Sequence, residues 1–272
     1  MVAAQPSVRD LANRTPRQLR ELIRAGEWRF PTAGLAAGYT QTNLAIVPRA
    51  LAYDFLLFCQ RNPQPCPLLE VLDAGDGEPR ELAPGADLRT DVPLYRVYRN
   101  GKLSDETDSL SAYWRDDLVS FLLGCSFTFE HPLVAAGIRL KHLEAGCDVN
   151  VPMFITNRPC KPAGCFEGPM VVSMRPILQS QVVQTVQITS RFPAVHGAPV
   201  HVGDPGALGI EDLQKPDFGD PMPVEDDEVP VFWACGVTPQ AVMMQTRPEI
   251  ALTHSPGHMF ITDRRERDLM AW

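Results

Sequence analysis

Side chains capable of acid–base, nucleophilic or carboxylate-binding chemistry are concentrated between Gly124 and Pro176, in turns rich in glycine and proline. Two short reactive loops lie in this tract, and a third lies near the end of the chain. The three loops are Phe129–Pro132, Thr156–Pro159 and Thr253–His258. Each adjoins an expected element end, and loops held by rigid elements often carry binding and catalytic groups. The three loops can therefore converge on one cleft.

Glu130 is the candidate general base of the first loop. It precedes His131 and Pro132 at an expected helix start, where a carboxylate also stabilises the positive end of the helix dipole. Capping is therefore the alternative role, and the two roles are compatible.

The second loop offers groups that bind a carboxylate. Asn157 and Arg158, with Thr156 beside them, form a polar fork, and Arg175 supplies a further guanidinium nearby in the sequence. A guanidinium binds a carboxylate with two parallel hydrogen bonds. A structural ion pair is the alternative for both arginines.

His254 and His258 have a spacing that could chelate a metal ion if they lay on a helix. Pro256 and Gly257 place a turn between them, so the distance between the rings is not fixed by the spacing. The sequence identifies no third ligand, and we predict no metal or cofactor. Histidines that form hydrogen bonds within a loop are the alternative.

Cys160 and Cys165 flank a short turn. A nucleophilic cysteine needs a base or a positive dipole to form its thiolate, and His131 or His254 could supply it. Free cysteines more often behave as small buried hydrophobes. We keep Cys165 as a reserve nucleophile only.

Composition limits the class of protein. The chain has 272 residues, a net charge of -8 and a hydrophobic fraction of 44%, as in ordinary soluble domains. The absence of a clustered basic face argues against nucleic-acid binding. No apolar run approaches the roughly 20 residues that span a bilayer, and the N-terminus lacks the apolar core of a signal peptide. The seven cysteines lack disulfide spacing, so we expect reduced thiols and a cytoplasmic protein.

The expected elements alternate between helices and strands. Thr15, Pro16 and Gln18 predict a capped helix that ends at Gly26. We also predict helices over 50–62, 111–127, 175–192 and 238–247, and strands over 151–157, 168–174 and 229–236. This alternation predicts a mixed α/β protein with a largely parallel sheet. No internal repeat is apparent.

Long stretches of the sequence resemble the D-glutamate cyclase family, whose bacterial members are named as hydro-lyases without an assigned substrate. The resemblance extends from about Arg24 to Asp263 and rests on strings such as FPTAGLAAGYTQTNLAIVP, GCSFTFEHPL, VPMFITNRPC, FPAVHGAPVHVGDP and THSPGHMFITD. It implies a three-layer αβα unit, from residues 1–84 with 200–272, and a smaller α+β unit from residues 85–199.

The resemblance also implies a reaction, the cyclisation of D-glutamate to 5-oxo-D-proline with loss of water. The substrate would be a small amino or carboxylic acid, and the family supplies no catalytic residues to carry over. From the chemistry, we assign Asn157 and Arg158 to the α-carboxylate, Glu130 to the base, and His258 or His254 to the acid. Alternatives are a metal-dependent hydratase or hydrolase that uses both histidines, and a non-catalytic amino-acid or carboxylate-binding protein. No nucleic acid or membrane partner is expected, and the sequence leaves open whether the chain forms a homo-oligomer.

Overall fold

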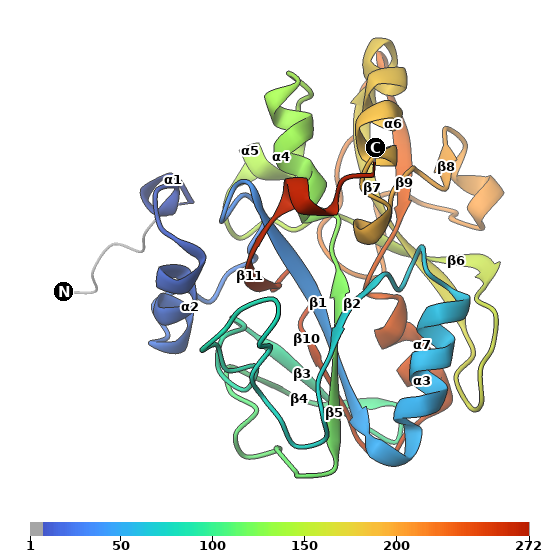
Figure 1. The fold of residues 1–272 in the computed structure, drawn as a ribbon. Coiled ribbons are helices and arrows are strands. Elements are labelled where there is room, and N and C mark those ends of the chain that lie inside the picture. Colours follow the sequence, from blue (N-terminus) through green and yellow to red (C-terminus); the bar gives the residue numbers. More distant parts are fainter. Residues whose placement is uncertain (1–7, 272) are drawn as a thin grey trace.

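The computed structural model describes residues 8–271 and contains two β-sheets with helices packed against them (Figure 1). The helices are α1 (Val8–Leu11), α2 (Pro16–Arg24), α3 (Arg49–Arg61), α4 (Phe127–Ala135), α5 (Lys141–Ala145), α6 (Val182–Ser190) and α7 (Thr238–Thr246). Four single turns of 3₁₀-helix are η1 (Gln179–Gln181), η2 (Pro193–Val195), η3 (Pro205–Leu208) and η4 (Glu266–Leu269). The expectation about a signal peptide concerns in part residues 1–7, which lie outside the described residues.

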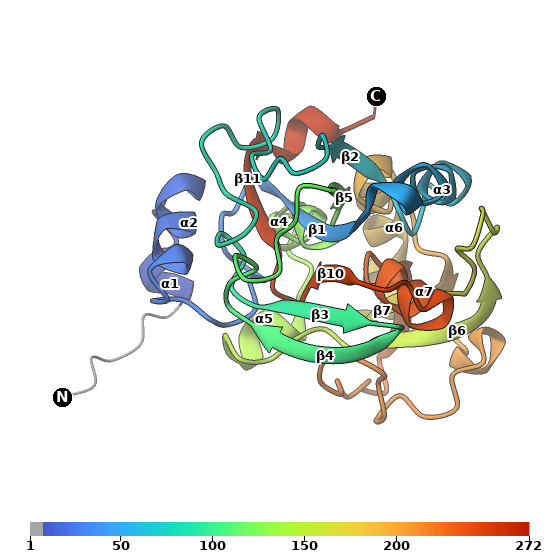
Figure 2. The same ribbon diagram turned by 90° about the horizontal axis from the view of Figure 1, so that it is seen from below.

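Eleven strands form the two sheets of the described chain. The first sheet contains β1 (Tyr39–Pro48), β2 (Leu68–Val71), β3 (Tyr95–Arg99), β4 (Lys102–Thr107), β5 (Leu118–Gly124), β10 (Ala251–His254) and β11 (Phe260–Arg265). The second contains β6 (Met153–Pro159), β7 (Pro169–Leu178), β8 (His201–Val202) and β9 (Glu228–Ala234). Figure 2 shows the β3–β4 hairpin beside β10.

The mixed α/β composition is confirmed, but the expectation of a largely parallel sheet is wrong. The first sheet has the order β2-β5-β1-β10-β3-β4, with β11 also pairing with β1, and the second has the order β6-β7-β9-β8. Every pair of neighbouring strands is antiparallel. The reason is that β5 begins beside the end of β1, with Leu118 opposite Pro48, and β9 begins beside the end of β7, with Glu228 opposite Leu178. The division into units 1–84 with 200–272 and 85–199 stays a prediction.

Two segments with nearly the same sequence form equivalent edge strands. MFITNRP at 153–159 forms β6, and MFITDRR at 259–265 contains β11. Thr156 Oγ1 donates to the carbonyl of Met170 at 2.7 Å, and Thr262 Oγ1 donates to the carbonyl of Thr40 at 2.8 Å. The two segments therefore meet β7 and β1 in the same way.

The central strands repeat the same relationship. Thr42 of β1 lies opposite Gly124 of β5 and Phe260 of β11. Val172 of β7 lies opposite Ala234 of β9 and Phe154 of β6. The register is thus the same in both sheets.

The helix starts that follow β5 and β9 also make equivalent contacts. Thr128 accepts from the amide of Gln41 at 3.1 Å and donates to its carbonyl at 3.4 Å. Thr238 makes the same pair of bonds with Val171, at 3.0 and 3.4 Å. The described chain therefore contains an internal repeat of two copies, and the prediction that it has no internal repeat is wrong. One copy is β1-α3-β2-β5-α4-β6 and the other is β7-α6-β8-β9-α7-β11, with β3, β4, α5 and β10 as additions.

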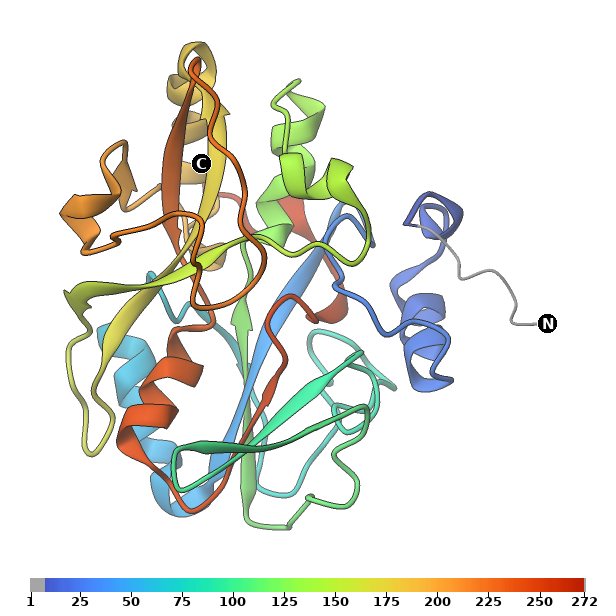
Figure 3. The same ribbon diagram turned by 180° about the vertical axis from the view of Figure 1, so that it is seen from behind.

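The repeats exchange their last strands. β6 closes the first copy in the sequence but pairs with β7 of the second, and β11 closes the second copy but pairs with β1 of the first. The helices mix in the same way: α3 and α7 cover the first sheet through Phe55, Phe58 and Val242, and α4 lies beside α6 on the second sheet (Figures 1 and 3). Each sheet therefore contains strands from both copies.

Candidate active site

A buried ion pair joins the two sheets. Glu130 lies in the first turn of α4, directly after β5, and Arg175 lies on β7. Arg175 donates from Nε and Nη2 to the same carboxylate oxygen, Glu130 Oε1, at 2.9 and 2.5 Å. Its Nη1 and Nη2 also donate to Ser173 at 3.1 Å and to Ser126 at 3.0 Å. Buried charges are stable only when they are paired and hydrogen-bonded in this way.

Aromatic rings enclose the guanidinium. The Cζ of Arg175 lies 5.5 Å from the ring centroid of Phe129 and 5.4 Å from that of Trp233, within the range of a cation–π interaction. Arg175 is only 1% exposed. The rings therefore shield the guanidinium of Arg175 from water.

A histidine completes the cluster. His142 on α5 places Nε2 at 3.0 Å from Glu130 Oε1, an ion-pair distance when the ring is protonated. Burial raises the pKa of Glu130, but the charges of His142 and Arg175 outweigh burial and lower it below its usual value. Glu130 is therefore a carboxylate at neutral pH. Its other oxygen, Oε2, is buried and has no hydrogen-bond partner among the described residues.

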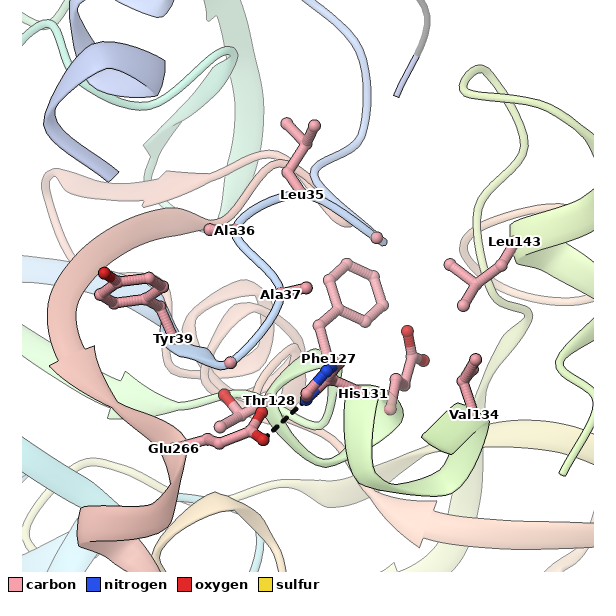
Figure 4. Close-up of a pocket in the computed structure, with 13 residues that line it drawn as sticks. Leu35, Ala36, Ala37, Tyr39, Phe127, Thr128, His131, Val134, Leu143 and Glu266 are labelled. Atoms are coloured by element: carbon pink, nitrogen blue, oxygen red, sulfur yellow. Dashed lines mark hydrogen bonds and ion pairs between the residues drawn. The ribbon is translucent and has the colours of Figure 1, made fainter. Parts of the chain in front are cut away.

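Glu130 lines a small hollow of 160 Å³. We call it the Glu130 hollow; it is bounded by the loop residues 34–39, by Phe127, Thr128, Glu130, His131 and Val134 of α4, and by Leu143 and Glu266. Figure 4 shows the loop that carries Ala36 and Ala37 on one side of the hollow and Phe127, His131 and Val134 of α4 on the other. His131 Nδ1 and Glu266 Oε1 lie at a hydrogen-bond distance of 2.7 Å at one side.

The loop opposite α4 presents free backbone donors. Within residues 8–271, the amides of Ala36, Ala37 and Gly38 donate to no other group. Gly34, Ala36 and Gly38 have positive φ angles of 78°, 50° and 81°, and a φ above zero is uncommon for alanine. Successive amides in such turns make concave sites for anions. The hollow is thus lined on one side by a loop whose amides are unbonded and on the other by a carboxylate.

A second, larger hollow adjoins the first. It has a volume of 580 Å³, and Gly34 and Leu143 line both hollows. His142 lines the larger hollow but not the Glu130 hollow. Glu130 therefore links the two, because it lines the smaller hollow and its Oε1 lies 3.0 Å from the His142 ring.

Curated relatives and a family model place the chain among known proteins. Residues 119–263 match the family model described as "D-glutamate cyclase". A protein named "Putative hydro-lyase" from Stutzerimonas stutzeri (strain A1501) is 64% identical over 261 residues, which covers 96% of this chain and 97% of that protein. Another from Geobacillus kaustophilus (strain HTA426) is 60% identical over 253 residues, covering 93% of this chain and 95% of the relative.

The chain belongs to the D-glutamate cyclase family. Its relatives are named as hydro-lyases, which supports the assignment of the protein as a lyase. A nitrogen repressor-like protein from Methanococcus jannaschii aligns over 87% of this chain and 91% of its own with a TM-score of 0.38 and 10% identity, a likeness too low to support an inference. None of the helices in residues 8–271 has the length and apolar character of a membrane span.

The structure of this family member brings together two of the predicted site residues, Glu130 and Arg175. Thr156 and Asn157 line a different hollow, of 390 Å³. Arg158 Nη1 donates to the carbonyl of Val200 at 3.3 Å. The three reactive loops therefore do not converge on one cleft.

The predicted histidines and cysteine also lie outside the Glu130 hollow. His254 is buried on β10, where its Nδ1 accepts from the amide of Leu44 at 3.0 Å. His258 lines a separate hollow near Arg96. Cys165 is exposed, and its partial burial raises the pKa of the thiol, which disfavours a thiolate. In the part of the chain that the structure describes, no three His, Cys, Asp or Glu residues are grouped to hold a metal ion.

Sequence reasoning missed His142, Ser126, Ser173 and the loop at 34–38. No motif in the sequence surrounds His142, so nothing there marks it as a site residue. The loop had a signal, since Gly34 and Gly38 bracket small residues before a polar strand. Only the fold shows that this loop faces Glu130.

Proposed function

We propose that the protein cyclises D-glutamate to 5-oxo-D-proline with loss of water in the Glu130 hollow. The observation that carries the proposal is the unpartnered Oε2 of Glu130, which belongs to a residue lining a hollow whose opposite wall has free amides. This arrangement suits a zwitterionic substrate. Its ammonium would bind the carboxylate of Glu130, and one of its carboxylates would bind the amides of residues 36–38.

The ion pair with Arg175 prepares Glu130 for the first step. Arg175 and His142 both contact Oε1, so Oε2 remains for the substrate. The lowered pKa keeps Glu130 ionised, and its Oε2 accepts a proton from the α-ammonium of the substrate. The resulting amine is then free to attack.

Ring closure forms a bond between the amine nitrogen and the γ-carboxyl carbon, and a carbon–oxygen bond then breaks. Two of the three ammonium protons end on the departing oxygen, which leaves as water, and the third stays on the lactam nitrogen. We assign the return of a proton to that oxygen to His142, whose Nε2 lies 3.0 Å from Glu130 Oε1. Positioned acid–base groups contribute roughly 10²–10⁴-fold each, and holding the amine against the carboxyl adds an orientation effect. These steps require no metal or redox cofactor.

The test is to incubate the purified protein with D-glutamate and with L-glutamate and to follow 5-oxoproline by chiral chromatography. We expect lactam from the D enantiomer, and a loss of about 100-fold or more in Glu130→Gln and in His142→Gln. His142→Gln leaves the Glu130–Arg175 pair intact, so it tests the chemistry where Glu130→Gln might lower stability. Glu249→Gln, at an exposed carboxylate, is the matched control with unchanged turnover.

Two results would contradict the proposal. Absence of lactam from either enantiomer with folded wild-type protein would remove D-glutamate as substrate. Unchanged turnover in both folded site variants would remove the Glu130 hollow as the place of the reaction.

A further inference from the structure

A polar hollow of 560 Å³, which we call the Arg96 hollow, shares none of the residues that line the Glu130 hollow. It shares Pro31 and Asp148 with the larger hollow that lies between the two. One side comes from residues 29–31, from Arg96 on β3 and from residues 255–258, which connect β10 to β11. The other side comes from residues 148–150, just before β6, and from residues 217–220. The hollow therefore lies between loops of the first sheet and loops that adjoin the second, a common place for ligand sites.

The cationic side chains come from the first-sheet side. Arg96 donates from Nε to Glu106 at 2.9 Å, and Arg29 forms an ion pair with Asp108. A guanidinium has five N–H donors, so each arginine keeps donors for a ligand carboxylate beyond its own partner.

The anionic side chains come from the opposite loops. Asp148, Asp217 and Asp220 all line the hollow. Asp217 Oδ2 accepts from the amide of Ile155 at 2.7 Å, and Asp220 Oδ2 accepts from the amide of Asn150 at 2.8 Å. Each of these two carboxylates is thus fixed through one oxygen, which leaves the other for a positively charged group.

The side chain of Asn150 on one side of the hollow packs against Gly257 on the other. It is 6% exposed and lines the hollow, and its Oδ1 has no partner among residues 8–271. A Cβ added at Gly257 would lie 2.4 Å from Asn150 Nδ2, so only glycine allows this close approach. A buried polar atom without a partner is costly, and a ligand in the hollow is one means of satisfying it.

Residues of the third reactive loop complete the first-sheet side. Ser255 Oγ donates to Glu106 at 2.8 Å and so supports the carboxylate that holds Arg96. Burial lowers the pKa of His258, which makes it a neutral hydrogen-bonding group at neutral pH. The loop that the sequence singles out at Thr253–His258 thus contributes to this hollow.

We propose that the Arg96 hollow is a second small-molecule site that binds a zwitterionic α-amino acid, with its carboxylate at Arg29 and Arg96 and its ammonium at Asp148 and Asp220. A ligand with both a carboxylate and an ammonium matches the cationic and the anionic side chains that line the hollow. The site is independent of the reaction proposed for the Glu130 hollow, and it binds amino acids that cannot cyclise.

The probe is norvaline in both enantiomers, because it has no side-chain carboxylate to react. Pentanoate lacks its ammonium and butylamine lacks its carboxylate. Binding to the full-length protein is measured by calorimetry, with the number of equivalents fitted. We expect norvaline to bind, and each singly charged analogue to bind at least tenfold more weakly. Arg96→Gln and Asp148→Asn should each remove one equivalent.

Two variants make the result specific. Arg99→Gln, on the exposed end of the same strand, should leave binding unchanged. Glu130→Gln should retain the equivalent that Arg96→Gln removes, which separates this site from the Glu130 hollow. Absence of norvaline binding, or norvaline binding that both Arg96→Gln and Asp148→Asn leave intact, would overturn the proposal, whatever the outcome with D-glutamate.

Discussion

Glu130 and Gln240 occupy the same position in the two repeats, two residues after Thr128 and Thr238. Glu130 accepts from Arg175, whereas Gln240 accepts from the hydroxyl of Tyr98 at 3.2 Å and donates to the carbonyl of His254 at 2.9 Å. The counterpart of Arg175 on β1 is Ala45, which has no charge to offer. A buried carboxylate without a cation is unstable, so the carboxylate and the guanidinium belong together. Only one repeat carries the charged pair.

Breaking this pair should cost far more stability than breaking an exposed one. Arg175→Ala leaves Glu130 buried without its main partner, and we expect the free energy of unfolding to fall by about 3–5 kcal/mol. Arg139→Ala breaks the exposed pair with Glu144 and should cost far less stability, because solvent screens exposed charges. Urea unfolding of both variants measures the difference. Equal losses would show that the ion pair does not stabilise the junction of the sheets.

The repeat predicts equal effects at two distant threonines. Thr128→Val and Thr238→Val each leave a buried backbone amide without its acceptor, and each should lower the free energy of unfolding by about 1–3 kcal/mol. Thr42 is also buried, but its hydroxyl has no partner within the described chain. Thr42→Val should therefore be close to neutral. Chemical denaturation of the three variants tests this, and a large loss in only one of the first two would contradict the equivalence.

Acid should destabilise the protein through two buried histidines. Burial lowers the pKa of His196 and of His254 to about 4, below their value in the unfolded chain. The unfolded state therefore binds protons first, so the stabilising contribution is present above pH of about 6.5 and is lost as the pH falls toward 4. The loss should reach about 3 kcal/mol for each histidine.

This dependence can be measured from the free energy of unfolding between pH 7.5 and 4.5. His254→Gln should have a shallower slope than the wild type, because it removes one of the two buried imidazoles. The lowered pKa of Glu130 acts below this range. A wild-type slope in His254→Gln would show that this histidine is not buried in its neutral form.

Local signals in the sequence predicted several elements correctly. Thr15 and Gln18 form the capping box that begins α2, because both bonds depend only on residues three apart. The apolar runs at 151–157 and 168–174 predicted β6 and β7. The helix expected over 111–127 is wrong, since Leu118–Gly124 is a strand buried on both faces, and apolar spacing alone does not distinguish the two.

The repeat and the site depended on distant contacts. Only the MFIT strings are identical over several residues, and the other equivalences are hydrogen bonds to the backbone that many side chains permit. The same applies to Glu130: the residue was predicted as a base, but its pairing with Arg175 and its place opposite the loop at 34–38 follow from strand register.

The exchange of β6 and β11 means that neither copy is complete as a separate folding unit. A chain with one copy alone would leave the first part of its central strand unpaired, and open strand edges invite association. Two such chains would satisfy each other by donating their last strands, as in a domain-swapped homodimer. The two copies thus have the strand exchange of a domain-swapped dimer within one polypeptide, and residues 160–168 connect β6 to β7.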